Sequence, residues 1–270
     1  MGDWVLLIPP SESKANPPGN GMLFSNAFAS KRTNAFKELN PLREKLMAAV
    51  EEALTRRAGL EQVFDVRGPA LDDAIRANRN LMQSTSMPAR ELYTGIMYEA
   101  ISYKTLGKAE KNLFNKNALI LSGMFGLVRP TDRLPAYKLK MSGNLGGVIG
   151  RVSNFWRQPV SEILRRELKG KVVWNFLPDT HQRVWDGTGE IVANHSVKFV
   201  KRVVRSGVAE WKTISHHSKS LKGALIRHLL SKNADSPRAL MDFEHPDGYR
   251  YNPSLSVRSK REALLVFAAE

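Results

Sequence analysis

The sequence predicts a mixed α/β fold of the α+β kind, because short apolar runs of strand length alternate with segments of helical period. Some neighbouring runs also carry hairpin signals, so we expect part of the sheet to be antiparallel. The 270 residues are 42% hydrophobic and 25% charged, which suits a chain that buries one sizeable core. No repeat, low-complexity tract or linker divides the chain, and we expect residues 1–270 to form one compact domain.

The first third of the chain predicts one strand and one long helix. Trp4–Ile8 is an apolar run that two prolines stop, which is typical of a buried strand. Asn40 and Pro41 have the pattern of an N-cap followed by proline at the first helical position. Apolar residues then recur with helical period as far as Gly59, a candidate C-terminal cap. We therefore predict a helix over about 41–58.

The rest of the chain predicts further strands and two helices. Apolar runs at 118–121 and 172–177 have strand length. The runs 197–204 and 208–214 flank Arg205-Ser206-Gly207, the pattern of a β-hairpin. Beyond them we expect a helix after Ser218, a short helix from Ser236-Pro237, a turn at Asp247-Gly248 and a last strand at 263–267.

The positive charge is concentrated in two stretches. The chain has 41 Lys plus Arg against 26 Asp plus Glu, a net charge of +15. Residues 129–171 contain ten basic and three acidic residues, and residues 198–232 contain nine and one, so their net charges of +7 and +8 account for the total. Such clustering, with a pI near 10.1, is typical of proteins that bind nucleic acid or another polyanion. A solvated basic surface that only aids solubility is the alternative.

Several classes of protein are excluded or disfavoured by missing features. The chain has no cysteine, which excludes disulfides, thiolate zinc sites and iron–sulfur clusters. No apolar run approaches the roughly 20 residues of a spanning helix, and no signal peptide is recognisable, so we expect a cytoplasmic protein that does not enter membranes. Phosphate-loop, dinucleotide, Gly-x-Ser-x-Gly and His-Glu-x-x-His patterns are missing too. We expect no cofactor and no metal, and a monomer.

The stretch 63–75 resembles a degenerate helix-hairpin-helix. In that motif a glycine lets the backbone approach a phosphate, and the next helix offers its unpaired N–H groups to it. The residues in register with the pattern are Val63, Val66, Gly68 and Ala74. Ala70 stands where the second glycine belongs, and Pro69 has no N–H to donate. A plain helical turn at Gly68 is the alternative.

Motifs along nearly the whole chain occur in an order shared with one family. The most specific block is LSGMFGLVRP at 121–130, followed by YKLKM at 137–141. The other matching segments are 7–14, 92–95, 154–156, 172–175, 219–223 and 247–249. Together they resemble the YaaA family, whose members are called peroxide stress proteins. The resemblance implies a cantaloupe-like mixed α/β fold with a helix-hairpin-helix and a positively charged cleft. It further implies protection against peroxide and free iron, and DNA binding.

Candidate anion or nucleic-acid contacts follow the predicted strands and turns. Polar residues after the strand at 4–8 occupy a common ligand position in α/β sheets. After the strand at 118–121, glycines let backbone amides approach an anion, an arginine can grip phosphate, and an aromatic residue beside a lysine suits a stacked base. These candidates are Ser11, Ser13, Lys14, Gly68, Tyr93, Thr94, Ser122, Gly123, Arg129, Tyr137, Lys138 and Asn175. Polar surface turns are the alternative for each.

A second group of candidates lies near the start of the helix after Ser218. His217, Ser218 and Lys219 would add donors and charge to a helix N-terminus, which attracts anions. His216 is a candidate general acid or base, as are Lys14 and Asp247, although an N-cap and a turn-capping aspartate are the ordinary interpretations.

Two functions are therefore predicted for one basic cleft. The first is a cytoplasmic stress-protection protein that binds DNA, with little sequence preference, or another polyanion. The alternative is an enzyme that acts on a nucleotide or another phosphorylated or carboxylated small molecule, and whether the protein is an enzyme stays open. A pocket of roughly 300–1,000 Å³ would favour the small molecule, and an open groove would favour DNA. A basic scaffold for an acidic protein partner is a third possibility.

Overall fold

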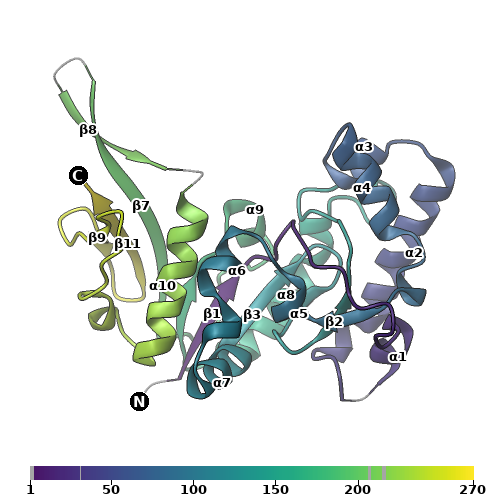
Figure 1. Ribbon diagram of the computed structural model, residues 1–270, viewed down its shortest axis with the longest axis horizontal. Coiled ribbons are helices and arrows are strands. Elements are labelled where there is room, and N and C mark those ends of the chain that lie inside the picture. Colours follow the sequence, from purple (N-terminus) through teal and green to yellow (C-terminus); the bar gives the residue numbers. More distant parts are fainter. Residues whose placement is uncertain (1–2, 31, 206–207, 215–216) are drawn as a thin grey trace.

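A nine-stranded mixed sheet forms the centre of the protein in the computed structural model, which describes residues 3–30, 32–205, 208–214 and 217–270 (Figure 1). The strand order is β10-β11-β7-β6-β1-β3-β4, with β8 paired to β7 and β9 to β11. The strands of this sheet are β1 (Trp4–Ile8), β3 (Ala118–Ser122), β4 (Gly126–Val128), β6 (Val172–Asn175), β7 (Ala193–Arg205), β8 (Val208–Thr213), β9 (Arg250–Tyr251), β10 (Val257–Arg258) and β11 (Glu262–Ala269). A separate two-stranded sheet pairs β2 (Ser86–Pro88) with β5 (Arg133–Pro135).

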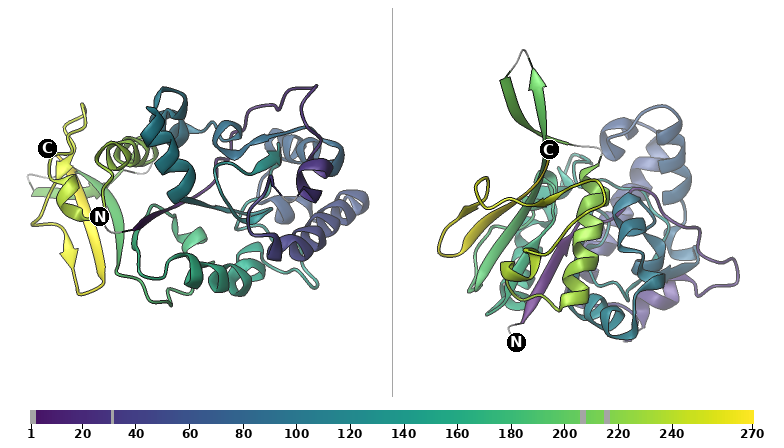
Figure 2. Two further views of the ribbon diagram at one scale, coloured as in Figure 1. Left: turned by 90° about the horizontal axis from the view of Figure 1, so that it is seen from below. Right: turned by 60° about the vertical axis from the view of Figure 1, so that its left-hand side comes forward.

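Helices cover both faces of the large sheet. The α-helices are α1 (Phe24–Ala29), α2 (Asn40–Arg56), α3 (Leu60–Phe64), α4 (Pro69–Asn78), α5 (Ala89–Leu92), α6 (Ile96–Ile101), α7 (Lys108–Asn117), α8 (Val152–Glu167), α9 (Asp179–Gln182) and α10 (Ser218–Lys232). Figure 2 shows α8 on one face and α6, α7 and α10 on the other. Since a sheet covered on both faces has buried strands, its centre is apolar throughout.

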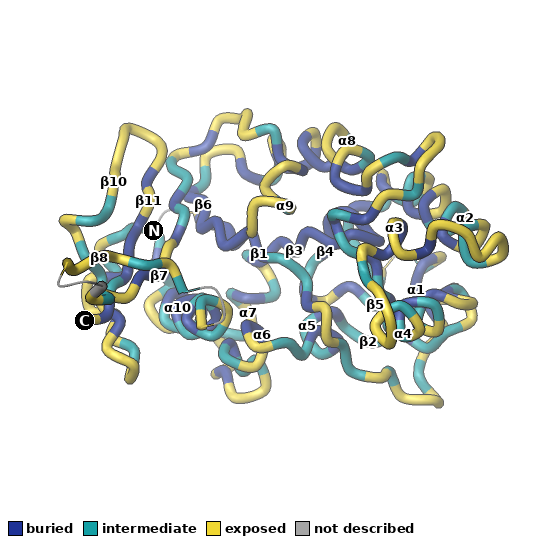
Figure 3. The backbone as a smooth tube through the Cα atoms, turned by 90° about the horizontal axis from the view of Figure 1, so that it is seen from above, coloured by how far each residue is buried: buried dark blue, intermediate teal, exposed yellow. Residues whose placement is uncertain are grey.

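The core lies along the central strands. Every residue of β1, β3 and β6 is buried, and these strands are dark blue in Figure 3. Trp156 and Trp174 have no exposed surface, so Trp156 is a core residue, as its place in an apolar helix face predicts. Nearly all of the buried apolar side chains in the described residues belong to one cluster, from which Val200 and Val266 are absent.

Strand β1 is the topological switch point of the sheet. It pairs in parallel with β3 on one side and with β6 on the other, and β6 pairs in parallel with β7. The chain therefore winds away from β1 in both directions, which leaves a crevice outside the carboxyl ends of the strands. The segments that follow Ile8, Ser122 and Asn175 all begin at this edge.

The predicted fold class is confirmed, and most predicted elements are present. The hairpin appears as antiparallel β7 and β8, although Ser206 and Gly207 lie outside the described residues. The predicted long helix is α2, which begins at Asn40 itself with Leu39 as its N-cap. The expected capping role of Asn40 is therefore wrong.

The predicted end of this helix also needs correction. Arg57, with φ of 55°, is the C-cap of α2, and Gly59, with φ of 66°, is instead the N-cap of α3. A short turn between two helices needs left-handed residues at both sites. Sequence periodicity does not reveal which of the two residues ends the first helix.

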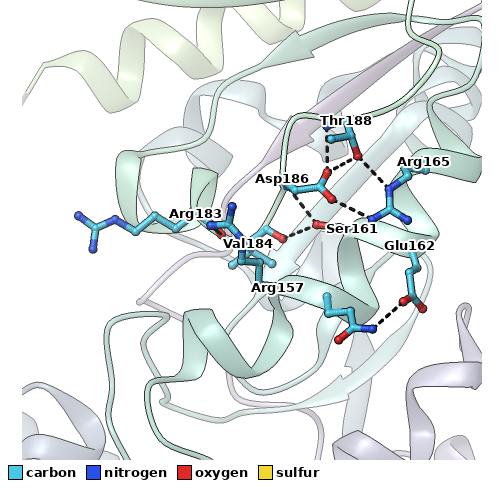
Figure 4. A network of polar contacts seen from close by, with 9 residues as sticks. Arg157, Ser161, Glu162, Arg165, Arg183, Val184, Asp186 and Thr188 are labelled. Atoms are coloured by element: carbon cyan, nitrogen blue, oxygen red, sulfur yellow. Dashed lines mark hydrogen bonds and ion pairs between the residues drawn. The ribbon is translucent and has the colours of Figure 1, made fainter.

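The segment after α9 is fastened to α8 by polar contacts (Figure 4). Arg165 forms an ion pair of 2.8 Å with Asp186 and donates a hydrogen bond of 2.9 Å to Thr188. Ser161 accepts a bond of 3.0 Å from the Asp186 amide and donates one of 3.2 Å to the Val184 carbonyl. These contacts fix the chain just beyond α9, and α9 borders the crevice described below.

Candidate functional site

A cavity of about 720 Å³ occupies the crevice at the carboxyl end of β1. Its walls come from the loop after β1, the α3–α4 pair, α6, the segment 137–142, the segment around α9 and the start of α10. Segments far apart in the sequence therefore meet at the switch point, where open α/β sheets bind their ligands. The basic residues that line it are Lys14, Lys138, Lys140, His181, Lys219 and Lys222, and the acidic ones are Glu12 and Glu99.

Lys14 lies at the base of this cavity, in the loop after β1. Its Nζ donates a hydrogen bond of 2.8 Å to the Ser11 carbonyl and lies 4.2 Å from the centre of the Tyr137 ring. Loss of water around the amine lowers the pKa of Lys14 to about 7, and repulsion from Lys138 acts in the same direction. An amine of this pKa is part neutral and part charged at physiological pH.

A chain of buried hydroxyl groups supports the floor beneath Lys14. The phenol of Tyr137 bonds to Ser122 Oγ at 2.7 Å and to the phenol of Tyr93 at 2.8 Å. Ser122 Oγ in turn accepts a bond of 3.0 Å from the Phe125 amide. Burial raises the pKa of Tyr137 to about 12 and that of Tyr93 well above its usual value, so both phenols stay protonated.

The loop that carries Lys14 is held by backbone contacts to the segment at 92–95. Ser11 Oγ accepts a bond of 2.8 Å from the Gly95 amide, and the Ser13 carbonyl accepts one of 3.2 Å from Thr94. A Cβ on Gly95 would lie 2.3 Å from Ser11 Oγ, so only glycine permits this approach. The polar turn predicted from the sequence is thus a rigid one.

Helix α10 supplies a second group of cations. Ser218, Lys219 and Lys222 all border the cavity, and Lys222 lies three and four positions after the other two, a spacing that places residues on one face of a helix. Lys222 Nζ donates a bond of 3.1 Å to the Phe176 carbonyl, just beyond the end of β6. Burial lowers the pKa of Lys222, and Asp179 opposes this shift.

Helices α3 and α4 form an apolar wall. Phe64, Val66, Ala70 and Ala74 border the cavity from this pair, which occupies the segment predicted as a helix-hairpin-helix. Gly68, with φ of 54°, is the exposed N-cap of α4 and is not among the lining residues. The observed pair therefore presents apolar side chains to the cavity.

His181 is a lining residue on α9. Burial lowers the pKa of His181 to about 4, so its imidazole is neutral at physiological pH. Its Nδ1 lies 3.3 Å from Thr180 Oγ1. A neutral imidazole at a cavity wall can accept or relay a proton.

The structure brings together seven of the residues predicted from the sequence. Those that border the cavity are Ser11, Ser13, Lys14, Tyr137, Lys138, Ser218 and Lys219. Four others lie directly beside or beneath this group, within its supporting structure: Tyr93, Thr94, Ser122 and Gly123. Asn175 is buried at the end of β6, where its side-chain oxygen accepts a bond of 3.1 Å from the Leu177 amide. The contacts found for these five residues, Asn175 and the four before it, are with other parts of the protein, and none of the five borders the cavity.

Arg129 does not join the cavity, which corrects the expectation that it shares one anion with Lys14 and Lys219. It borders a different, smaller hollow beside the amino end of β1. There its guanidinium forms an ion pair of 2.6 Å with Glu167 and donates a bond of 2.7 Å to the Lys116 carbonyl. Strand β4 runs antiparallel to β3, so Arg129, directly after β4, lies away from the strand end at which Ser122 lies.

Of the candidates near the start of α10, Ser218 and Lys219 border the cavity, whereas His217 lies outside it beside Asp247. His217 and Asp247 lie 3.6 Å apart (Nε2 to Oδ2), and His245 Nδ1 lies 3.4 Å from the same carboxylate oxygen. None of the three is a lining residue of the cavity. His216 lies outside the described residues. Within the described residues, no group of three or more His, Asp or Glu side chains is arranged to hold a metal.

Three cationic residues of the cavity were not among the predicted contacts: Lys140, His181 and Lys222. The spacing of Lys222 from Lys219 and Ser218 on one helix was a usable signal. The sequence contains no comparable signal for His181, because a single histidine has no neighbouring residue with which it forms a recognisable pattern.

The fold and the cavity together define a mixed α/β protein with a cation-lined pocket at the switch point of its sheet. The chain belongs to the family described as peroxide stress protein YaaA, whose model matches residues 5–255. A UPF0246 protein of Streptomyces coelicolor is 28% identical over 261 residues, which is 95% of each chain. An uncharacterized protein of Campylobacter jejuni is 28% identical over 222 residues, 82% of each. A UPF0246 protein of Methylibium petroleiphilum is 31% identical over 182 residues, 64% of this chain and 67% of the relative.

None of the helices within the described ranges is both long and apolar enough to cross a membrane.

Proposed function

We propose that this protein acts in cytoplasmic protection against peroxide by binding, and chemically transforming, a small anionic molecule in the cavity at the end of β1. The peroxide role rests on the family. The small-molecule role rests on one observation: a cavity of about 720 Å³ that is lined by Lys14 from the loop after β1 and by Lys219 and Lys222 from α10. That volume is within the range of roughly 300–1,000 Å³ that is typical of small-molecule sites.

The lining favours a ligand with one charged end and one apolar part. Lys219 and Lys222 supply charge from α10, whereas Phe64 and Val66 supply an apolar surface from the opposite wall. Lys138 is partly neutralised, because its Nζ lies 3.1 Å from Asp73. Phosphorylated or carboxylated compounds, including nucleotides, have the anionic group and the apolar part that such a lining would bind.

The test is ligand binding measured by calorimetry and thermal shift. We expect phosphorylated and carboxylated compounds to raise the melting temperature, since a ligand that binds only the folded state stabilises it. Lys222→Gln should weaken binding about tenfold or more, because a hydrogen bond to a charged group contributes about 1.5–3 kcal/mol. Lys169→Gln removes the same charge from an exposed pair with Glu190 and should leave binding unchanged. Equal effects of the two substitutions would contradict a site in the cavity.

The peroxide role has its own test in bacterial cells that lack their own family member. Expression of this chain should restore growth in hydrogen peroxide, and the Lys222→Gln variant, at equal protein level, should restore less. Full rescue by that variant would separate the peroxide role from the cavity.

A second candidate function is binding of single-stranded nucleic acid along the β7–β8 ribbon, which projects from the body in Figure 1. Lys201 and Lys212 are paired directly opposite each other, and so are Arg202 and Trp211. Like charges placed opposite each other on a ribbon repel, and a phosphate between them would relieve the repulsion. Trp211 is 39% exposed beside an arginine, which suits base stacking.

The ribbon is tested by fluorescence anisotropy with a labelled single-stranded oligonucleotide. Trp211→Ala should weaken binding by about 1–3 kcal/mol if a base stacks on the indole. Met241→Ala, an exposed apolar side chain outside the ribbon, is the matched control and should have no effect.

A further inference from the structure

Lys14 differs from the other lysines of the cavity in its partners. Lys138 Nζ lies 3.1 Å from the Asp73 carboxylate, whereas no carboxylate among the described residues forms an ion pair with Lys14. The Lys14 amine has two close neighbours, the Ser11 carbonyl at 2.8 Å and the face of the Tyr137 ring at 4.2 Å, and the Tyr93 ring lies farther away at 5.6 Å. A lysine that lines a cavity without a carboxylate in ion-pair contact is unusual, since buried cations are normally paired.

These two neighbours match the hydrogens of a neutral amine. A neutral –NH₂ group has two N–H bonds and one lone pair, and the carbonyl oxygen and the ring face can each accept one N–H. The third tetrahedral direction, which belongs to the lone pair, is then free for the cavity that Lys14 lines. The geometry therefore suits a nucleophile.

The surroundings also favour the neutral form. Loss of hydration lowers the pKa of Lys14 to about 7, and the nearby charge of Lys138 adds to this shift, while Glu12 opposes it. The Tyr137 ring also favours the charged form, which keeps the amine protonated part of the time. Desolvation together with a neighbouring cation is the arrangement that activates lysine in imine-forming enzymes.

We propose that Lys14 is a catalytic nucleophile that forms an imine with the carbonyl carbon of an anionic aldehyde or ketone bound in the cavity. This proposal rests on the proposed function and names its substrate class. Lys219 and Lys222 hold the phosphate or carboxylate of the ligand, and the carbonyl end reaches Lys14.

The step balances without an oxidant or a reductant. The amine lone pair forms a C–N bond as the carbonyl π electrons move to oxygen, which takes up a proton. The carbinolamine then loses its hydroxyl group as water when the nitrogen lone pair forms the C=N bond. The nitrogen gives up both of its hydrogens, and both leave in the water molecule. His181, neutral and on the same cavity wall, is placed to carry protons in these steps.

Reductive trapping tests the imine. The full chain is incubated with glyceraldehyde 3-phosphate or pyruvate, treated with sodium borohydride and analysed by intact mass and peptide mapping. We expect one reduced adduct per chain, on Lys14, with a yield that rises between pH 6 and pH 8 and levels off above pH 8. An ordinary lysine, with a pKa of 10.5, is almost wholly charged in this range, so its yield would be far lower and would keep rising towards pH 10.

Three variants make the result specific. Lys14→Arg keeps the positive charge but cannot form an imine, and it should abolish the adduct while the protein still folds. Lys222→Gln should lower the yield about tenfold at limiting probe, through lost anion binding. Lys169→Gln removes an exposed lysine that pairs with Glu190 outside the cavity, and it should retain the adduct.

The outcomes separate this proposal from the proposed function. A thermal shift with either probe and no adduct on Lys14 would overturn the imine and leave small-anion binding intact. Adducts spread over surface lysines, and unchanged in Lys14→Arg, would also overturn it. Neither binding nor trapping with any anionic carbonyl compound would overturn both.

Discussion

At the scale of single residues, the positions of polar side chains were predictable and their partners were not. The sequence placed Ser122 and Tyr137 after a buried strand, where ligand contacts are common. The structure places both hydroxyls in a buried chain with Tyr93. A hydroxyl bonds to whatever the fold brings near it, and Tyr93 comes from a segment 44 residues away. Local pattern therefore indicated where these hydroxyls lie in the chain but not that they bond to one another.

The buried hydroxyl chain leads to the first prediction. Tyr137→Phe removes the phenol that joins Tyr93 to Ser122 and leaves both without that partner. We expect the free energy of unfolding to fall by about 1–3 kcal/mol, the cost of unsatisfied buried groups, in urea denaturation. Tyr251→Phe removes a half-buried phenol whose partner is the Arg258 side chain, and should cost far less. Equal losses would show that the buried chain contributes nothing beyond an ordinary hydrogen bond.

At the scale of elements, strands and helices with strong periodicity were predictable, and their ends were not. The α2 helix forms where the periodicity places it, because burial of one face dominates local preference. The β7–β8 hairpin also lies where it is predicted, although β8 is almost wholly exposed. The caps differ: Asn40 directly follows the 3₁₀ turn Lys37–Leu39 inside the helical run, and Gly59 belongs to the left-handed turn between α2 and α3. The sequence did not predict that α3 and α4 form an apolar wall of the cavity. The small and apolar residues of a phosphate-binding helix-hairpin-helix pattern are the same residue types that form such a wall.

The contact between α6 and α10 leads to the second prediction. Gly223 lets α10 approach α6 so closely that an added Cβ would lie 2.3 Å from the Met97 carbonyl oxygen and 2.7 Å from the Ala100 Cβ. Gly223→Ala should separate two walls of the cavity and destabilise the protein by about 1–3 kcal/mol, as overpacking does. Thermal unfolding measures this loss of stability. The control is Gly19→Ala, because an added Cβ on Gly19 would meet no atom within 4 Å. A variant as stable as the control would contradict the close packing.

The link between α8 and the segment after α9 leads to the third prediction, which concerns acid. Partial burial would raise the pKa of Asp186, but hydrogen bonds from Arg165 and Thr188 lower it to about 2, below the ordinary 3.8. A carboxylate with a lowered folded-state pKa stabilises the protein above pH 4, and this contribution is lost as the pH falls towards 2.

Asp186→Asn isolates that contribution. At pH 6 the variant should be less stable than the parent by about 1 kcal/mol, a figure reduced for solvent screening. The difference should shrink between pH 4 and pH 2, when denaturant midpoints are compared across this range. Glu52→Gln, which removes a carboxylate from the exposed pair with Arg56, should show little change at either pH. A constant difference for Asp186→Asn would mean that its carboxylate does not titrate as described.

At the scale of the whole molecule, the sequence gives the amount of positive charge but not its arrangement. Lys138 and Lys140 of the first basic stretch and Lys219 and Lys222 of the second line one cavity. Other cations of the first stretch form ion pairs outside the cavity: Arg129 with Glu167, Arg165 with Asp186, Arg166 with Glu38 and Lys169 with Glu190. Which acid neutralises which base depends on folding, and a count of charges contains no such information.

This division of charge leads to the last prediction, which separates the two candidate functions by salt dependence. Single-stranded nucleic acid on the ribbon would be gripped by Lys201 and Lys212, which lie opposite each other on one face, whereas Arg202 faces the other side. Each neutralised phosphate contributes a slope of roughly −0.7 to a plot of log affinity against log salt, so two contacts give about −1.4. Lys201→Gln, the ribbon variant, should bring the slope to about −0.7, because one contact remains. Lys222→Gln should leave the slope for nucleic acid unchanged while it weakens binding of the small anion. If instead the cavity variant flattens the slope and the ribbon variant does not, the polyanion binds across the mouth of the cavity, and the two functions share one site.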